Sequence, residues 1–154
     1  AIGSPAYQRL LADIESRITP RTRPLAVLHP NHPTRAVYPR ALLEQIAELA
    51  ARHRPVVMAD EIYDEILYDG AEFVPMATVA TETVCLTFSG LSKVHRACGW
   101  RVGWLSLSGH LKRAQDYRHA LDPLAAGELP RCELRQQARL AGAGAAGDGD
   151  QQTG

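Results

Sequence analysis

The stretch from residue 83 to residue 107 constrains the fold of this chain most strongly. It holds two apolar runs rich in β-forming residues, Val84 to Phe88 and Val102 to Leu107, and between them lie a small-residue turn, Lys93 and Arg101. This pattern predicts a strand, a loop that carries the lysine, and a second strand. A lysine held between two buried strands would lose hydration, which disfavours its ammonium form and makes the amine nucleophilic near neutral pH. The alternative interpretation is an exposed lysine in a loop.

The part of the chain before this stretch predicts alternating helices and strands. Helices are expected over residues 5–17 and 39–53. Short apolar runs predict strands at 24–28, covered on both faces, and at 56–59. Strand, helix, strand in this order favours a parallel pair, so the predicted fold class is α/β, a mostly parallel sheet with flanking helices. Asp60 follows the second strand, at the edge where such sheets bind ligands.

Further structural expectations concern charges and the end of the chain. On the solvent face of helix 39–53, Glu48 and Arg52 have the i,i+4 spacing of an ion pair. The charges after Asp60 are expected to be solvated; they are Glu61, Asp64 and Glu65. Another helix is predicted over residues 109–124. The alanine- and glycine-rich end has no apolar period and is predicted to be disordered.

Four blocks of the sequence together resemble a known family. They read, in order, DIESRITPRTR, HPNHPTRAVY, ADEIYDEILYD and GLSKVHRACGWRVGW. They resemble the pyridoxal phosphate-dependent class I/II aminotransferases of fold type I, and within them the bacterial alanine aminotransferases. The resemblance covers roughly residues 10–125 and implies that the chain is a fragment of the large domain. Residues 1–125 would then be the central part of that domain, and residues 126–154 a divergent tail.

The resemblance assigns a role to each of four residues. Lys93 matches the lysine that carries the internal aldimine and shuttles a proton. Asp60 matches the carboxylate that contacts the pyridine nitrogen, and Tyr63 the phenol that hydrogen-bonds the ring oxygen. Arg101 matches the arginine that clamps the phosphate, which suits a planar group that is always charged. Taken singly, these residues read as a turn cap for Asp60, a half-buried core tyrosine for Tyr63, and a surface ion pair for Arg101.

Two positions depart from the family pattern. His32 stands where the family has an asparagine that hydrogen-bonds the cofactor, and Arg35 stands where it has a glycine. An imidazole can also donate a hydrogen bond, but an arginine pays a steric cost if the turn needs a positive φ. His29 and His32 could also suggest a metal site, but no third ligand lies nearby, so no metal is predicted.

The resemblance implies a transaminase that moves an amino group between a small amino acid such as alanine and a 2-oxo acid. The alternatives are a carbon–sulfur lyase with the same cofactor, and a non-catalytic remnant or effector-binding module. Relative to the family, the chain lacks the start of the large domain and the whole small domain, so turnover is expected to be very poor. The full-length family is expected to form homodimers.

Composition adds limits on partners and location. Seventeen basic and seventeen acidic residues give a formal net charge of zero. Bulk charge therefore predicts neither a nucleic-acid partner nor an anionic membrane. No apolar run is long enough to span a membrane, and no signal peptide is indicated. Three cysteines without zinc-type spacing favour reduced thiols in a cytoplasmic protein.

Overall fold

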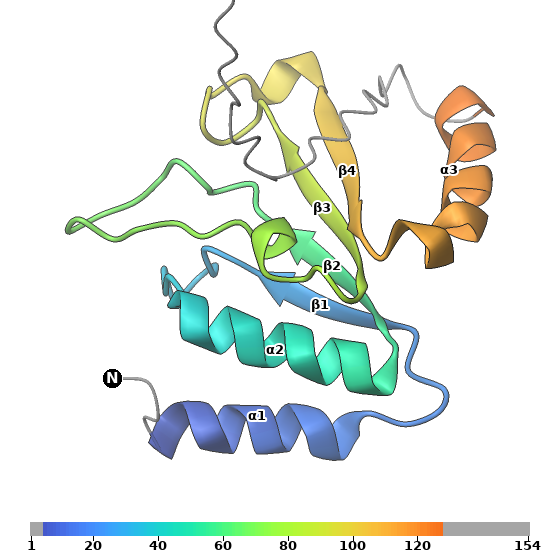
Figure 1. The fold of residues 1–154 in the computed structure, drawn as a ribbon. Helices are drawn as coiled ribbons and strands as arrows, with labels where there is room; N and C mark the ends of the chain where they lie inside the picture. Colours follow the sequence, from blue (N-terminus) through green and yellow to red (C-terminus); the bar gives the residue numbers. More distant parts are fainter. Residues whose placement is uncertain (1–4, 128–154) are drawn as a thin grey trace, which may run out of the picture.

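The sheet at the centre of the molecule has four strands. The computed structural model describes residues 5–127 and places the strands in the order β1-β2-β3-β4 (Figure 1). Their bounds are Pro24–Leu28 for β1, Val56–Asp60 for β2, Val84–Gly90 for β3 and Gly103–Gly109 for β4. The pairs β1–β2 and β2–β3 are parallel, and β4 runs antiparallel to β3. The predicted α/β class with a mostly parallel sheet is confirmed.

Helix α2 (Arg40–His53) covers one face of the sheet and contributes the largest share of the main core cluster of any single element. The apolar stripe of this helix is buried, and its residues are Leu42, Leu43, Ile46, Ala47, Leu49 and Ala50. This stripe packs on side chains of β1, β2 and β3, among them Val27, Val57 and Cys85. Arg54 follows the last residue of the helix and has a left-handed φ of 66°.

Helix α1 (Pro5–Arg17) lies along the outer side of α2 (Figure 1). It has no buried residue, although Tyr7 and Leu11 pack against the core. Glu15 joins the two helices, because its carboxylate lies 3.3 Å from the guanidinium of Arg52 and 3.0 Å from the imidazole of His53. The predicted pairing of Arg52 with Glu48 is therefore wrong, since the neighbouring helix offers a second carboxylate.

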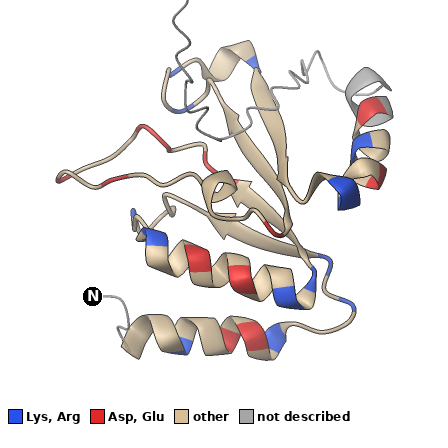
Figure 2. Ribbon diagram, in the orientation of Figure 1, with Lys and Arg blue, Asp and Glu red and all other residues tan. Residues whose placement is uncertain are grey.

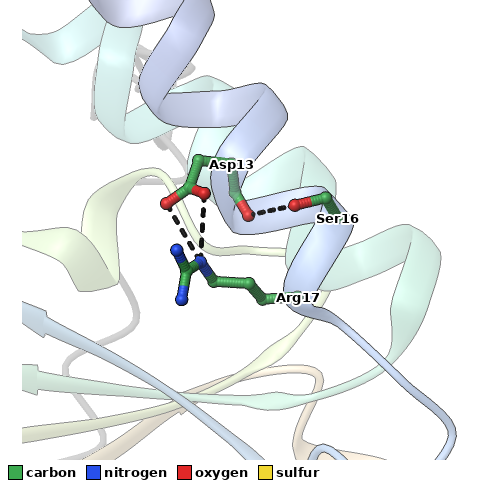
Figure 3. A network of polar contacts seen from close by, with 3 residues as sticks. All are labelled: Asp13, Ser16 and Arg17. Carbon is green, nitrogen blue, oxygen red and sulfur yellow. Dashed lines mark hydrogen bonds and ion pairs between the residues drawn. The ribbon is translucent and has the colours of Figure 1, made fainter.

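Polar contacts within α1 lie in its last turns. The guanidinium of Arg17 donates to both carboxylate oxygens of Asp13, and the Ser16 hydroxyl donates to the Asp13 carbonyl (Figure 3). The Asp13–Arg17 pair is exposed, so it contributes only a few tenths of a kcal/mol. Charged residues recur along α1 and α2, whereas the central strands carry few (Figure 2). The helices thus keep their charges in water while α2 buries its apolar stripe.

The other face of the sheet is covered in part by α3 (Gln115–Gly127). The predicted start of the helix over 109–124 is wrong, because Gly109 is still the last residue of β4 and has a φ of 79°. A short 3-10 turn, Leu111–Arg113, precedes α3. Ala114 is buried against Val84 and Leu86, and Leu121 packs on the same cluster. The tail predicted over residues 126–154 lies outside the described residues except for the end of α3.

Strand β1 is less covered than predicted. Of its five residues only Val27 is buried, and Leu28 is 42% exposed. The expectation that this strand is covered on both faces is wrong for the described part of the chain, where β1 is an edge strand with α2 on one side only. No helix within residues 5–127 is long and apolar enough to cross a membrane.

Candidate functional site

Strand β2 delivers Asp60 to the carboxyl edge of the parallel strands. Asp60 is the last residue of β2 and lies opposite Leu28 of β1 and Phe88 of β3. Its side chain is exposed, and one carboxylate oxygen accepts a hydrogen bond from the Ile62 amide at 3.2 Å. The carboxylate thus caps the turn that follows the strand and also faces the edge where open α/β sheets bind ligands.

Three side chains from three different loops meet at this edge. The half-buried ring of Tyr63 stacks on the imidazole of His32, with centroids 5.5 Å apart and an interplanar angle of 26°. The amine nitrogen of Lys93 lies 5.9 Å from the centre of the same tyrosine ring, which is within the range of a cation–π contact. The fold therefore brings together two residues that the sequence assigned to one site, Tyr63 and Lys93, and adds His32 to them.

The environment of Lys93 differs from the predicted one. The lysine is exposed in the loop between β3 and β4, beyond the ends of both strands. Backbone hydrogen bonds close this loop, from Leu91 to the Val102 carbonyl and from Ala97 to the Leu91 carbonyl, both at 3.1 Å. The expectation of a desolvated lysine between buried strands is wrong here, because the loop lifts the residue off the sheet instead of leaving it within the strand pair.

Arg101 ends the same loop, one residue before the Val102 carbonyl that closes it. Its backbone is left-handed, with a φ of 53°, and its guanidinium donates to the Cys98 carbonyl at 3.1 Å. The side chain is exposed and has no ion pair among the described residues. The guanidinium contacts neither Lys93 nor Tyr63, so the structure links Arg101 to them only through the closed loop.

The strand end at Gly90 is packed so closely that only glycine fits. A Cβ at this position would lie 2.9 Å from the Val102 carbonyl oxygen and 3.0 Å from the α-carbon of Gly103. The side chain of Ile62 also approaches it, at 3.5 Å. The Asp60–Tyr63 turn and the lysine loop therefore meet where β3 ends.

The loop between β1 and α2 carries both departures from the family pattern. Arg35 adopts a φ of 60°, which confirms that this turn needs a positive φ and that an arginine here is strained. Its guanidinium lies 5.7 Å from the centre of the Tyr68 ring. His29, at the start of the loop, is fully buried between the rings of Tyr38 and Phe73, and this burial lowers the pKa of its imidazole.

Glu61 is the residue of this region that sequence reasoning missed. It was expected to be solvated, but it is only 5% exposed, and its carboxylate accepts a hydrogen bond from the Met76 amide at 2.7 Å. Burial raises the pKa of this carboxyl to about 7. Its neighbours Asp60, Asp64 and Glu65 are also acidic, so nothing in the local sequence distinguishes the one carboxylate that turns inward.

A hollow of about 500 Å³ lies beside the edge, between the loops that follow β1 and β2. Its lining includes Arg35, Tyr68 and Asp69 and none of the four residues assigned from the sequence. Of those four residues, Asp60, Lys93 and Arg101 are exposed and Tyr63 is half-buried.

Comparison with known proteins identifies the family of the chain. Residues 4–144 match the family model described as aminotransferase class I and II. The alanine aminotransferase of Mycobacterium tuberculosis is 45% identical over 119 residues, and the glutamate-pyruvate aminotransferase AlaA of Escherichia coli is 47% identical over 119 residues. Each alignment covers 77% of this chain but only 28% and 29% of the respective relative. The chain thus spans less than a third of the length of these relatives.

Solved structures give the same result. A crystal structure of an aminotransferase from Escherichia coli matches with a TM-score of 0.72 at 47% identity, covering 75% of this chain and 29% of that one. An alanine aminotransferase from Pyrococcus furiosus matches with a TM-score of 0.71 at 36% identity and the same coverage. Pyridoxal phosphate is the cofactor that these similarities imply. The chain therefore belongs to the family of class I and II aminotransferases.

Proposed function

We propose that this chain is the cofactor-holding part of an aminotransferase and that Lys93 is the residue that binds pyridoxal phosphate covalently. The observation that carries the proposal is the contact of Lys93 with Tyr63 at the carboxyl edge of the sheet. Tyr63 lies three residues after Asp60, the last residue of β2. An amine, a phenol and a carboxylate on adjoining loops are the groups that a ring with an aldehyde, a phenolic oxygen and a basic nitrogen requires.

The residues present fit this cofactor. Asp60 offers a negative charge at the edge, which would keep an adjacent ring nitrogen protonated. Tyr63 and His32 stack on each other, and both side chains can donate a hydrogen bond to an anionic ring oxygen. Arg101 is exposed and has no acidic partner among the described residues, so its guanidinium can donate hydrogen bonds to two phosphate oxygens.

Bound pyridoxal phosphate supplies an electron sink that stabilises negative charge at the α-carbon of an amino acid. The part that this chain would play is to place a base beside that carbon. The amine of Lys93, in its neutral form, can take the proton from the α-carbon and, as an ammonium, donate it to a second atom within its reach. Its exposure in the loop leaves the amine accessible to an incoming substrate.

The relatives suggest the substrates. Their names specify alanine, and glutamate with pyruvate. We therefore propose a small amino acid and a 2-oxo acid as the substrate pair, in a cytoplasmic homodimer. Because this chain aligns with only 28% and 29% of these two relatives, we expect the 154-residue chain to bind cofactor but to turn over far more slowly than a full-length relative.

Covalent labelling tests the assignment of Lys93. The purified chain is mixed with pyridoxal phosphate, reduced with borohydride, digested and analysed by mass spectrometry. The label should lie on Lys93 and be lost in Lys93→Ala. Lys112 is the only other lysine in the sequence, so Lys112→Ala is the matched control and should label normally. An unlabelled protein, or a label that stays after Lys93→Ala, would contradict the proposal.

A further inference from the structure

The turn between Asp60 and Tyr63 is tied to the rest of the molecule by Glu61. The Glu61 amide donates to the Phe88 carbonyl at the end of β3, at 2.9 Å. Its side-chain carboxylate accepts a hydrogen bond from the Met76 amide at 2.7 Å. Glu61 is thus held at both its backbone and its side chain, while Asp60 on one side is exposed and Tyr63 on the other is half-buried.

Met76, which donates this hydrogen bond, is itself held in place by the core. It begins the short 3-10 turn Met76–Thr78, and its side chain is fully buried in the main core cluster. Val74 and Ala80 on either side belong to the same cluster. The hydrogen bond from Met76 therefore connects the turn that carries the site residues to the core below the sheet, across a separation of fifteen residues.

Asp60 and Tyr63 depend on this connection to different degrees. Asp60 is the last residue of β2 and is paired with strands on both sides. Tyr63 lies beyond the strand, and the placement of its ring decides whether it meets His32 and Lys93. The position of Tyr63 therefore relies more on the anchor at Glu61 than that of Asp60 does.

We propose that Glu61 is a positioning residue for the cofactor site: its buried carboxyl, bonded to the Met76 amide, fixes the turn so that the Tyr63 hydroxyl is presented correctly to the cofactor. This inference rests on the proposed function. A carboxyl that only stabilised the fold would affect unfolding but would not act on cofactor binding through Tyr63.

Hydrogen exchange of the cofactor-free protein tests the anchor itself. Glu61→Ala should accelerate exchange of the Met76 amide by about tenfold or more, because a buried donor loses its acceptor. Glu61→Gln keeps an acceptor oxygen and should exchange within about threefold of the natural chain. Glu65→Ala, which alters an exposed carboxylate of the same loop, is the matched control. Unchanged exchange at Met76 in Glu61→Ala would overturn the inference.

A double-mutant cycle tests the action through Tyr63. Under conditions where circular dichroism finds each variant folded, Glu61→Ala should weaken pyridoxal phosphate binding about tenfold, and Glu61→Gln should restore it. In a Tyr63→Phe background the same Glu61→Ala change should have no further effect, since the hydroxyl that it misplaces is already gone. Additive losses, or normal affinity in Glu61→Ala, would overturn the positioning role. Absence of binding by the natural chain would instead overturn the proposed function.

Discussion

At the scale of single residues, Arg96 and Arg101 share a backbone conformation but differ in their side-chain contacts. Both are left-handed, with φ of 52° and 53°, and both lie in the loop that carries Lys93. Of these two arginines, only Arg101 makes a side-chain hydrogen bond within residues 5–127, from its guanidinium to the Cys98 carbonyl. If Arg101 binds the cofactor phosphate, replacing Arg101 should weaken cofactor binding, whereas replacing Arg96 should not.

Arg101→Gln is expected to weaken pyridoxal phosphate binding about 10- to 100-fold, because charge-assisted hydrogen bonds contribute about 1.5–3 kcal/mol. Arg96→Gln is the matched control and should bind normally. Absorbance titration with pyridoxal, which lacks the phosphate, separates the effects, since Arg101→Gln should leave that affinity unchanged. An equal loss for both ligands would mean that Arg101 does not contact phosphate.

The residue scale also marks the limits of sequence reasoning about this site. The steric cost of Arg35 was predictable, because a turn that requires glycine requires a positive φ, and Arg35 adopts one. The burial of Glu61 was not predictable, because its partner Met76 lies in a loop without a sequence signal. Of the two interpretations of Lys93, the exposed loop lysine is the one observed, because apolar flanks do not report how far a loop rises from the strands.

At the scale of elements, α2 was well predicted from the sequence, and its C-terminal end offers a substitution that should stabilise the fold. It was expected over residues 39–53 and spans Arg40–His53. Its end at Arg54 needs a left-handed residue, whose amide donates to the Ala50 carbonyl. Glycine adopts this conformation without the steric cost that a side chain pays.

Arg54→Gly should raise the free energy of unfolding by about 0.5–1 kcal/mol. The substitution removes the steric cost of a Cβ in the left-handed region, and the greater backbone entropy of glycine in the unfolded chain offsets part of that gain. Arg54→Ala retains a Cβ in the left-handed region and should give no such gain. Urea unfolding of both variants measures the difference. A decrease with glycine would mean that the Arg54 side chain stabilises the helix end in another way.

At the scale of the whole molecule, the buried groups Glu61 and His29 affect the free energy of unfolding in opposite directions as pH changes. The pKa of Glu61 is raised by burial from its ordinary 4.5 to about 7. Between these values the folded chain holds a proton that the unfolded chain has lost, so stability falls as pH rises through this window. Burial lowers the pKa of His29, so its contribution is lost as pH falls below the ordinary 6.5.

Glu61→Gln isolates the first effect. Its advantage in unfolding free energy over the natural chain should grow by about 3 kcal/mol between pH 4.5 and pH 8, because the amide cannot ionise. The His29 contribution is common to both proteins and cancels in the difference. Urea unfolding at several pH values measures this advantage. A difference that stays constant with pH would show that the Glu61 carboxyl titrates normally.

The amino-acid sequence by itself determined helices α1 and α2, the strands, the parallel pairing and the family, because each follows from local periodicity or from motifs that are contiguous in the chain. Only the tertiary structure decided which charges are buried and which side chains meet. Glu61 reaches Met76 across 15 residues, and Glu15 pairs with His53 across 38. Burial depends on segments that are distant in sequence and adjacent in space, and no local pattern contains that information.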